Sequence, residues 1–421
     1  MTAPMTTSFI RENEAGGPLA ILATMDNCTK CGICQTYCPV AAVTSEFPGP
    51  KVVGPQAQRF RAIEAIAESA IGLCSGCGVC TSVCPNGVAI TDIIAIAKAA
   101  SVENGNKPAL GLRLLNRPDL VGHLAGSLPW LANSLFASRP LRRLAEKVLG
   151  ISADAALPHI EGGAFRRWFS QQEQPNGPAI AYFTGCTVEN YEANVGKSVV
   201  LLLNHLGFRV ELPTDLCCGL PLLSNGEWPP ARERAQHLTK ALAPSARTAQ
   251  AIVSSSTSCS LTLRKKYAAY LDMKDGESSE VATATIDICG FLRDLPAEPL
   301  ESRLKSMRHT ALYHGPCQLR GHQMGWPAVE LLSLIPGLQL QLSSAVCCGT
   351  AGTYGFDRDK RAVTDAVAVT LLDQIRVSKP DFIICDSETC RWHIAAESGL
   401  PCFHPVEILL ASIEGRGPLA D

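Results

Sequence analysis

The chain of 421 residues is long enough for two or three domains, and it is 46% hydrophobic but only 18% charged. Its formal net charge of −2 and the lack of a basic block argue against nucleic acid as a partner. We expect neither a transmembrane helix nor a signal peptide, because no sufficiently long apolar run and no basic segment before an apolar core occur. The 19 cysteines then indicate metal or redox chemistry in the cytoplasm, where disulfides are rare.

Two cysteine motifs of equal spacing follow a short N-terminal extension (1–24). Each reads C-x2-C-x2-C-x3-C-P, from Cys28 to Pro39 and from Cys74 to Pro85. In this pattern the first three thiolates hold one iron–sulfur cubane, and the cysteine before proline binds the other cluster. We therefore assign two 4Fe–4S clusters, one with the ligands Cys28, Cys31, Cys34 and Cys84 and the other with Cys74, Cys77, Cys80 and Cys38. Zinc sites are the weaker alternative, because they usually combine two C-x2-C pairs.

The sequence around these motifs favours helices. Apolar residues recur at helical spacing between Pro55 and Leu73, and residues 88–100 show a helical pattern after the second motif. Bacterial two-cluster ferredoxins have strands in a shorter gap. We therefore predict an all-helical ferredoxin domain over 25–105, of the type that relays electrons in respiratory iron–sulfur subunits.

Residues 106–178 contain no cysteine and form a predicted helical connector that ends in the polar boundary segment QQEQPNGP. Within it, residues 120–149 predict an amphipathic helix or helix pair, broken at Pro129 and Pro140. Two interpretations stay open. We favour a connector packed on the C-terminal domains, since any connector with one apolar face shows this pattern. The alternative is a segment that lies on a membrane surface or lines a quinone site.

The remaining sequence is duplicated with a period of 130 or 131 residues. A lone cysteine, a Cys-Cys-Gly triplet and a Ser-x-x-Cys segment occur in this order in both copies. The first copy (179–300) contains Cys186, Cys217, Cys218 and Cys259, and the second (301–421) contains Cys317, Cys347, Cys348 and Cys390. Inert buried cysteines are a poor explanation for two such sets, so we expect these thiols to bind a metal.

Each copy alternates predicted strands and helices. The predicted strands are residues 179–184, 208–212 and 251–254 in the first copy, which also has a helix over 194–206, and 310–314, 338–342 and 381–384 in the second. The cysteines fall at strand ends, which converge on one crevice in an open α/β sheet. The predicted fold class is therefore α+β multidomain, with an all-helical two-cluster ferredoxin domain followed by two tandem α/β domains.

No nucleotide fingerprint and no nucleophile–base pair is present. The run Gly349-x-x-Gly352-x-x-Gly355 differs from G-x-G-x-x-G and does not open a strand–turn–helix unit. We interpret it as a tight turn beside the metal crevice. We expect no flavin or NAD in this chain, and we assign no catalytic residue.

These motifs resemble the CCG-domain iron–sulfur proteins, which include glycolate oxidase and lactate utilisation iron–sulfur subunits and heterodisulfide reductase subunits. FPGPK at 47–51 and CCGTAGTYGF at 347–356 favour the branch formed by the iron–sulfur subunits of anaerobic glycerol-3-phosphate dehydrogenases. The wider pattern ends each module in C-x-x-C, whereas Ser256 and Ser387 stand here at the first position of that pair. Five-thiolate noncubane clusters are therefore in doubt, and a cubane, a modified cluster or zinc stays open for each module. The roles of three further cysteines stay open too: Cys289, Cys385 and Cys402.

The resemblance implies a non-flavin electron-transfer subunit of a glycerol-3-phosphate:quinone oxidoreductase complex. A flavoprotein partner would supply electrons to the two 4Fe–4S clusters. One or two further metal centres, iron–sulfur or zinc, would then pass them to the membrane quinone. The protein would be cytoplasmic and peripheral on the inner face of the cell membrane. The alternatives are an iron–sulfur subunit of a glycolate or lactate oxidase, a heterodisulfide-reductase-like thiol–disulfide reductase, and structural zinc domains in the C-terminal half.

Overall fold

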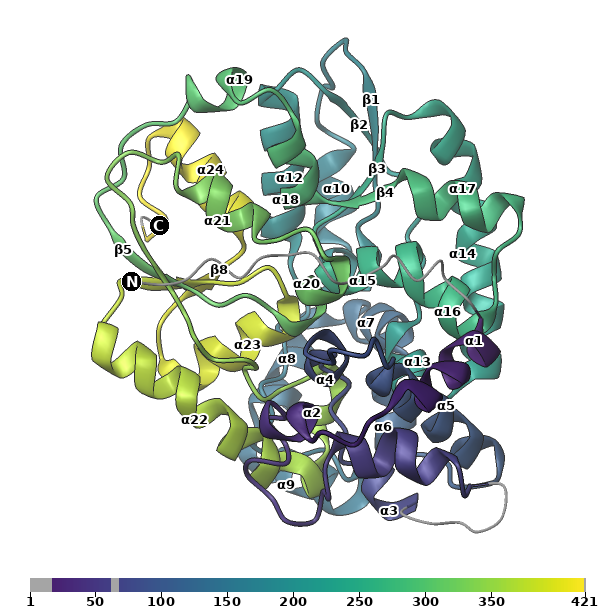
Figure 1. Ribbon diagram of the computed structural model, residues 1–421. Helices are drawn as coiled ribbons and strands as arrows, with labels where there is room; N and C mark the ends of the chain where they lie inside the picture. Colours follow the sequence, from purple (N-terminus) through teal and green to yellow (C-terminus); the bar gives the residue numbers. More distant parts are fainter. Residues whose placement is uncertain (1–16, 62–67, 420–421) are drawn as a thin grey trace.

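Two four-stranded parallel sheets, one in each copy of the duplicated sequence, organise the computed structural model, which describes residues 17–61 and 68–419 (Figure 1). We call the copies the first repeat (179–300) and the second repeat (301–421). The region before the connector, called the ferredoxin-like region (25–105), lies below both repeats in this view.

Both sheets have the same strand order, β2–β1–β3–β4 and β6–β5–β7–β8. The strands of the first sheet are β1 (Ala179–Tyr182), β2 (Arg209–Glu211), β3 (Ile252–Ser254) and β4 (Thr285–Asp287). Those of the second are β5 (Thr310–Tyr313), β6 (Gln339–Leu342), β7 (Phe382–Ile384) and β8 (Cys402–Phe403). All pairings are parallel, so helical crossovers join the strands and cover the sheets. The shared order confirms the predicted duplication.

The sequence predicted three strands in each repeat, and the structure adds a fourth. The three strands of each sheet lie at the predicted positions, but β4 and β8 were missed. β4 begins directly after helix α17 (Gly276–Ala284), and β8 has only two residues. Neither segment is long enough for an apolar run to stand out from its neighbours.

Helices fill the crossovers of both repeats. The first repeat contains α11 (Gly185–Asn190), α12 (Ala193–His205), α13 (Leu220–Ser224), α14 (Trp228–Thr248), α15 (Thr257–Leu261), η3 (Thr262–Lys266), α16 (Tyr267–Leu271), α17, α18 (Ile288–Asp294) and α19 (Glu298–Glu301). The second contains α20 (Cys317–His322), α21 (Pro327–Leu332), η4 (Gly352–Phe356), η5 (Arg358–Lys360), α22 (Arg361–Ser378), α23 (Glu388–Ser398) and α24 (Pro405–Glu414). Helices α12 and α24 contact each other, and one apolar cluster contains residues of both sheets, so the repeats share a core.

The ferredoxin-like region consists of short helices in its described part. These are η1 (Thr24–Asn27), α2 (Ile33–Thr36), η2 (Val52–Gln56), α3 (Glu68–Ile71), α4 (Val79–Ser82) and α5 (Ile90–Glu103), and α1 (Pro18–Ala23) precedes them. Residues 62–67 lie outside the described ranges, so the helix expected over 55–73 is described only at its ends. The all-helical domain therefore stays a prediction. The buried face of α5 joins the same apolar cluster as α13 and α14 of the first repeat.

The connector forms α6 (Leu110–Leu115), α7 (Pro118–Gly126), α8 (Pro129–Ala137), α9 (Arg139–Leu149) and α10 (Ala164–Phe169). The expected helix or helix pair over 120–149 was wrong in number, because three helices cover this range. Pro129 and Pro140 begin new helices, where a missing N–H is tolerated. The connector packs on both repeats, since Tyr191 Oη donates to the Pro118 carbonyl (2.7 Å) and Ser152 N to the Phe356 carbonyl (2.8 Å). In the described ranges, no helix has both the length and the apolar character to cross a bilayer.

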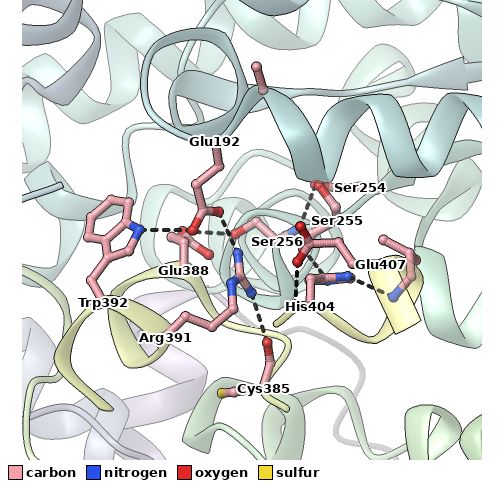
Figure 2. A network of polar contacts seen from close by, with 12 residues as sticks. Glu192, Ser254, Ser255, Ser256, Cys385, Glu388, Arg391, Trp392, His404 and Glu407 are labelled. Atoms are coloured by element: carbon pink, nitrogen blue, oxygen red, sulfur yellow. Dashed lines mark hydrogen bonds and ion pairs between the residues drawn. The ribbon is translucent and has the colours of Figure 1, made fainter. Parts of the chain in front are cut away.

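A buried ion pair joins the two repeats. Arg391 of α23 contacts Glu192, the residue before α12, with an Nη2–Oε2 distance of 2.5 Å (Figure 2). Arg391 also donates to the Cys385 carbonyl, and Trp392 Nε1 donates to Glu192 at 2.8 Å. The Arg391 side chain is only 4% exposed, so both charges depend on each other for compensation.

Replacing Arg391 with Met should lower the free energy of unfolding by about 3–5 kcal/mol, because the substitution leaves Glu192 buried without its cation. The denaturant midpoint, followed by circular dichroism, measures this loss. Arg376→Met is the matched control, since Arg376 pairs with Asp373 on the exposed surface of α22 and should change stability little. Equal effects of the two substitutions would show that the buried pair does not stabilise the joined repeats.

Candidate metal centres and the cavity between them

Four ferredoxin-like cysteines gather around the start of α2. Cys28 follows η1, Cys34 lies in α2, and Cys84 comes from the turn after α4. Burial raises the pKa of the Cys34 thiol, and the nearby Cys84, Cys28 and Cys31 raise it further. Cys31 is exposed, so this group reaches the surface. The structure thus brings together the four residues that motif spacing assigned to one cluster, while their role as ligands stays a prediction.

The other four ferredoxin-like cysteines, Cys38, Cys74, Cys77 and Cys80, line a small cavity beside α4. The fourth cysteine of the first motif therefore lies with the first three of the second, which is the arrangement that crossed ligation needs. Burial raises the pKa of Cys77 to about 12, and the next contribution comes from Cys347. This group is therefore a neighbour of the second repeat.

In the first repeat, four buried thiols come from three loops at the strand ends. Cys186 lies in α11 after β1, Cys217 and Cys218 precede α13, and Cys259 lies in α15 after β3. The Sγ atoms of Cys186 and Cys217 are 3.6 Å apart, and those of Cys218 and Cys259 are 3.2 Å apart. Hydrogen bonds with the Cys186 and Cys218 thiols lower the pKa of Cys217 well below its ordinary value. A thiolate is the form that binds metals.

The second repeat reproduces this geometry. The Sγ atoms of Cys348 and Cys390 are 3.1 Å apart, and hydrogen bonds with Cys317 and Cys348 lower the pKa of Cys347 well below its ordinary value. The backbone N–H after each cysteine pair donates to the first sulfur of the pair, at 3.4 Å in the first repeat and 3.3 Å in the second. The duplicated sequence therefore forms two equivalent sets of four thiols.

The glycine after each cysteine pair permits this turn. Gly219 and Gly349 have φ of +69° and +95°, in the left-handed region that favours glycine. A Cβ atom at Gly349 would lie 2.3 Å from the Thr364 carbonyl oxygen, so no larger residue fits there without a shift. Four converging thiols, one of them a thiolate, suit either an iron–sulfur cluster or zinc.

The second set also has a histidine neighbour that the first set lacks. His314 is fully buried, and neither ring nitrogen has a hydrogen-bond partner among the described residues. Cys390 and Cys347 are its nearest acidic neighbours. A buried imidazole without partners is costly, so this environment fits an additional group beside the thiols. The corresponding position of the first repeat is Phe183.

One cavity of about 220 Å³ connects the three regions. It is lined by Cys74 of the ferredoxin-like region, by all four thiol residues of the first set, and by Cys317 and Cys390 of the second set. Apolar residues of the connector, including Phe136, Leu157 and Ile160, complete the wall. The thiol groups that the sequence assigned to separate domains therefore face one shared space.

Ser256 occupies the position where the wider CCG pattern has a cysteine. Its Oγ accepts a hydrogen bond from Cys259 N and donates to Glu388 Oε1 of the second repeat, both at 3.2 Å (Figure 2). Burial raises the pKa of Glu388 to about 7. The serine thus caps α15 and connects the repeats at the cavity wall.

Several residues of this site were not found by sequence reasoning. Lys98 of α5 donates to the carbonyls of Cys74 (3.5 Å) and Ser224 (3.2 Å) and lines the cavity, but no motif marks it. Burial lowers its pKa to about 8. Glu388 lies inside the Ser387-x-x-Cys390 segment, where a charged residue among buried cysteines was a usable signal. Of the cysteines without an assigned role, Cys385 is a direct neighbour of Cys390.

Comparison with known proteins defines the class. Residues 24–88 match the 4Fe-4S dicluster domain, and residues 180–264 and 311–395 each match the cysteine-rich domain named CCG. The chain is therefore an iron–sulfur protein in which a dicluster domain precedes two cysteine-rich domains.

The similarity to one named protein extends over nearly the whole chain. The C-type subunit of anaerobic glycerol-3-phosphate dehydrogenase from Escherichia coli K12 is 33% identical over 402 residues, which are 93% of this chain and 99% of that protein. The chain belongs to the family of this anaerobic glycerol-3-phosphate dehydrogenase subunit. The B-type subunit of fumarate reductase (CoM/CoB) from Methanothermobacter marburgensis is 28% identical over 62% of this chain and 49% of its own length. Lactate utilization protein A of Geobacillus kaustophilus is 27% identical over 55% of this chain and 98% of its own length.

The grouping of the ferredoxin-like cysteines leads to a test with paired variants. Cys38→Ser and Cys77→Ser should each lower the iron content by about four atoms per chain and leave the same residual EPR spectrum, because both damage one cluster. Cys84→Ser and Cys31→Ser should share a second, different spectrum. If Cys38→Ser matched Cys31→Ser instead, the crossed pairing would be wrong. Cys402→Ser serves as the control and should keep all iron.

Proposed function

We propose that this chain relays electrons from a flavoprotein partner to a membrane quinone as the iron–sulfur subunit of a glycerol-3-phosphate dehydrogenase complex. The printed name of the Escherichia coli relative supports the substrate. The observation that carries the relay is the shared cavity, which brings thiols of the ferredoxin-like region and of both repeats to one space. The chain then uses two 4Fe–4S clusters at the assigned ferredoxin-like cysteines and further centres at the two sets of four thiols.

The arrangement of the thiol groups supports an order for the relay. The group with Cys31 is the one that reaches the surface, together with the exposed side chains of Ile33 and Tyr37. The flavoprotein therefore docks at this face. The group with Cys77 adjoins Cys347, so the second repeat receives electrons from the ferredoxin-like region, and the first repeat follows across the cavity.

Iron–sulfur clusters supply one-electron redox chemistry when they are bound. The chain's own residues provide the setting. Lys98 places a cation beside Cys74, which favours additional negative charge at that end of the cavity. The connector side chains exclude water from the wall opposite the thiols. Glu388 and Ser256 hold the two repeats at a fixed separation where the thiol sets face each other.

The rival functions receive less support. The lactate utilization relative covers only 55% of this chain, although it favours the same electron-transfer class. A thiol–disulfide reductase of the heterodisulfide type is disfavoured because Ser256 and Ser387 stand where the paired cysteines would be. Structural zinc in the repeats would remove them from the relay, and the next experiment separates that case.

Substitution of one cysteine in each repeat tests the order of the relay. With the flavoprotein, glycerol-3-phosphate and a soluble quinone, both Cys347→Ser and Cys217→Ser should still allow reduction of the ferredoxin-like clusters but lower quinone reduction to background. Freeze-quench EPR should then show a reduced second-repeat centre in Cys217→Ser and an oxidised first-repeat centre in Cys347→Ser. Wild-type repeats that contain only zinc and stay EPR-silent in every redox state would contradict this proposal. Cys402→Ser is again the control.

The exposed face of the connector supports peripheral binding to the inner membrane surface. Large apolar side chains of α7, α8 and α9 remain exposed: Leu124, Leu128, Trp130, Leu144 and Val148 are between 53% and 70% exposed. Arg139, Arg143 and Lys147 are exposed on α9 as well. An apolar face bordered by cations is typical of helices that lie on anionic lipid. The connector therefore both packs on the repeats and offers a membrane-binding surface.

The double substitution Trp130→Glu and Leu131→Glu should weaken sedimentation with anionic vesicles about tenfold or more, because two apolar contacts are lost and two anions are added. High salt should also release the wild-type protein. Iron content should not change. Val377→Glu is the matched control, since Val377 is 84% exposed on α22, away from this surface. Binding that resists both the acidic residues and high salt would refute a peripheral contact through the connector.

A further inference from the structure

A buried cluster of metal-binding side chains lies outside the cavity, between the two repeats. Asp287 is the last residue of β4, Cys289 lies in the first turn of α18, and Asp386 follows β7. One donor atom from each lies within 4.8 Å of those of the other two. The first two residues belong to the first repeat and the third to the second repeat. The relay proposed above uses none of them.

The cluster has no access to water, and each residue is only 1% exposed. Asp287 caps α18 by accepting a hydrogen bond from Cys289 N (2.9 Å), and Tyr313 Oη donates to Asp386 Oδ2 (2.6 Å). Asp386 Oδ1, in contrast, has no hydrogen-bond partner among the described residues. A buried carboxylate oxygen without a partner is costly and indicates a missing cation or proton.

The charges of the cluster also lack a directly bonded cation. Neither carboxylate forms an ion pair with any described residue, and Arg391 is held by Glu192. Burial raises the pKa of Asp287 to about 8, and the nearby Asp386 contributes further to this rise, which the more distant Arg264 only partly offsets. Two carboxylates and a thiol in this setting form a site that binds a divalent ion in exchange for protons.

We propose that Asp287, Cys289 and Asp386 bind one zinc ion that joins the two repeats. The combination of one sulfur and two carboxylate ligands suits zinc, whereas magnesium and calcium prefer ligand sets made only of oxygen. A water molecule takes the fourth position of the tetrahedral ion. Because the ligands come from the ends of β4 and β7, the ion holds both sheets at their carboxyl edges. This role is independent of electron transfer.

Zinc X-ray absorption on the intact, iron-loaded full chain tests this site. The protein is incubated anaerobically with one equivalent of zinc chloride and then desalted. We expect one zinc per chain, surrounded by one sulfur and otherwise by oxygen. A zinc ion with four sulfur neighbours would place it in a repeat's thiol set and overturn the proposal, as would the absence of retained zinc. In the last case the carboxyl groups share protons instead.

Matched variants assign the ligands. Cys289→Ser should remove the sulfur neighbour from the zinc spectrum, and Asp386→Asn should lower retained zinc at least tenfold, both with unchanged iron content. Asp294→Asn, an exposed acid at the end of α18, should keep all zinc. Full zinc retention in Asp386→Asn would overturn the proposal. If a variant loses iron through misfolding, the wild-type zinc spectrum still decides the ligand set.

Discussion

In each repeat, four thiols lie within a few ångströms of one another and away from water, and this constraint governs much of the fold. Thiols in such a place repel each other once they ionise, and burial alone disfavours their charged forms. The chain meets this cost with local means, since Cys217 and Cys347 each accept hydrogen bonds from their neighbours and from the backbone N–H of the following glycine. The remaining demand is best met by a positively charged inorganic group, and parallel strands bring the required loops to one edge.

The two repeats have the same strand order but different surroundings for their thiols. His314 and Cys385 lie beside the second set, whereas Phe183 takes the position of the histidine in the first. Ligand type and hydrogen bonding are the main means by which a protein adjusts an iron–sulfur centre. Such differences give two centres unequal affinities for electrons, which a directional relay requires. Duplication supplied the sites, and later divergence of single residues separated their properties.

The features that the sequence predicted well are those that chemistry ties to fixed spacings. Cysteine motifs are readable because cluster geometry dictates which residues are ligands, and the repeat was visible because Cys217 and Cys347 head identical triplets. Short elements such as β8 left too little periodicity to detect. Contacts such as Ser256 with Glu388, and Asp287 with Asp386, were beyond reach because they depend on how one repeat faces the other. The number of connector helices was underestimated although its prolines were noted.

The apolar clusters also bear on how this protein can change over time. One cluster contains residues of both sheets, and another joins α5 to helices of the first repeat. Neither copy of the duplicated unit therefore retains a surface that could face water by itself. Once such a common interior forms, the copies can no longer be separated, rearranged or inherited singly. A mutation in one copy is then selected for its fit to the other, so the ancestral domain survives only as half of a larger cooperative whole.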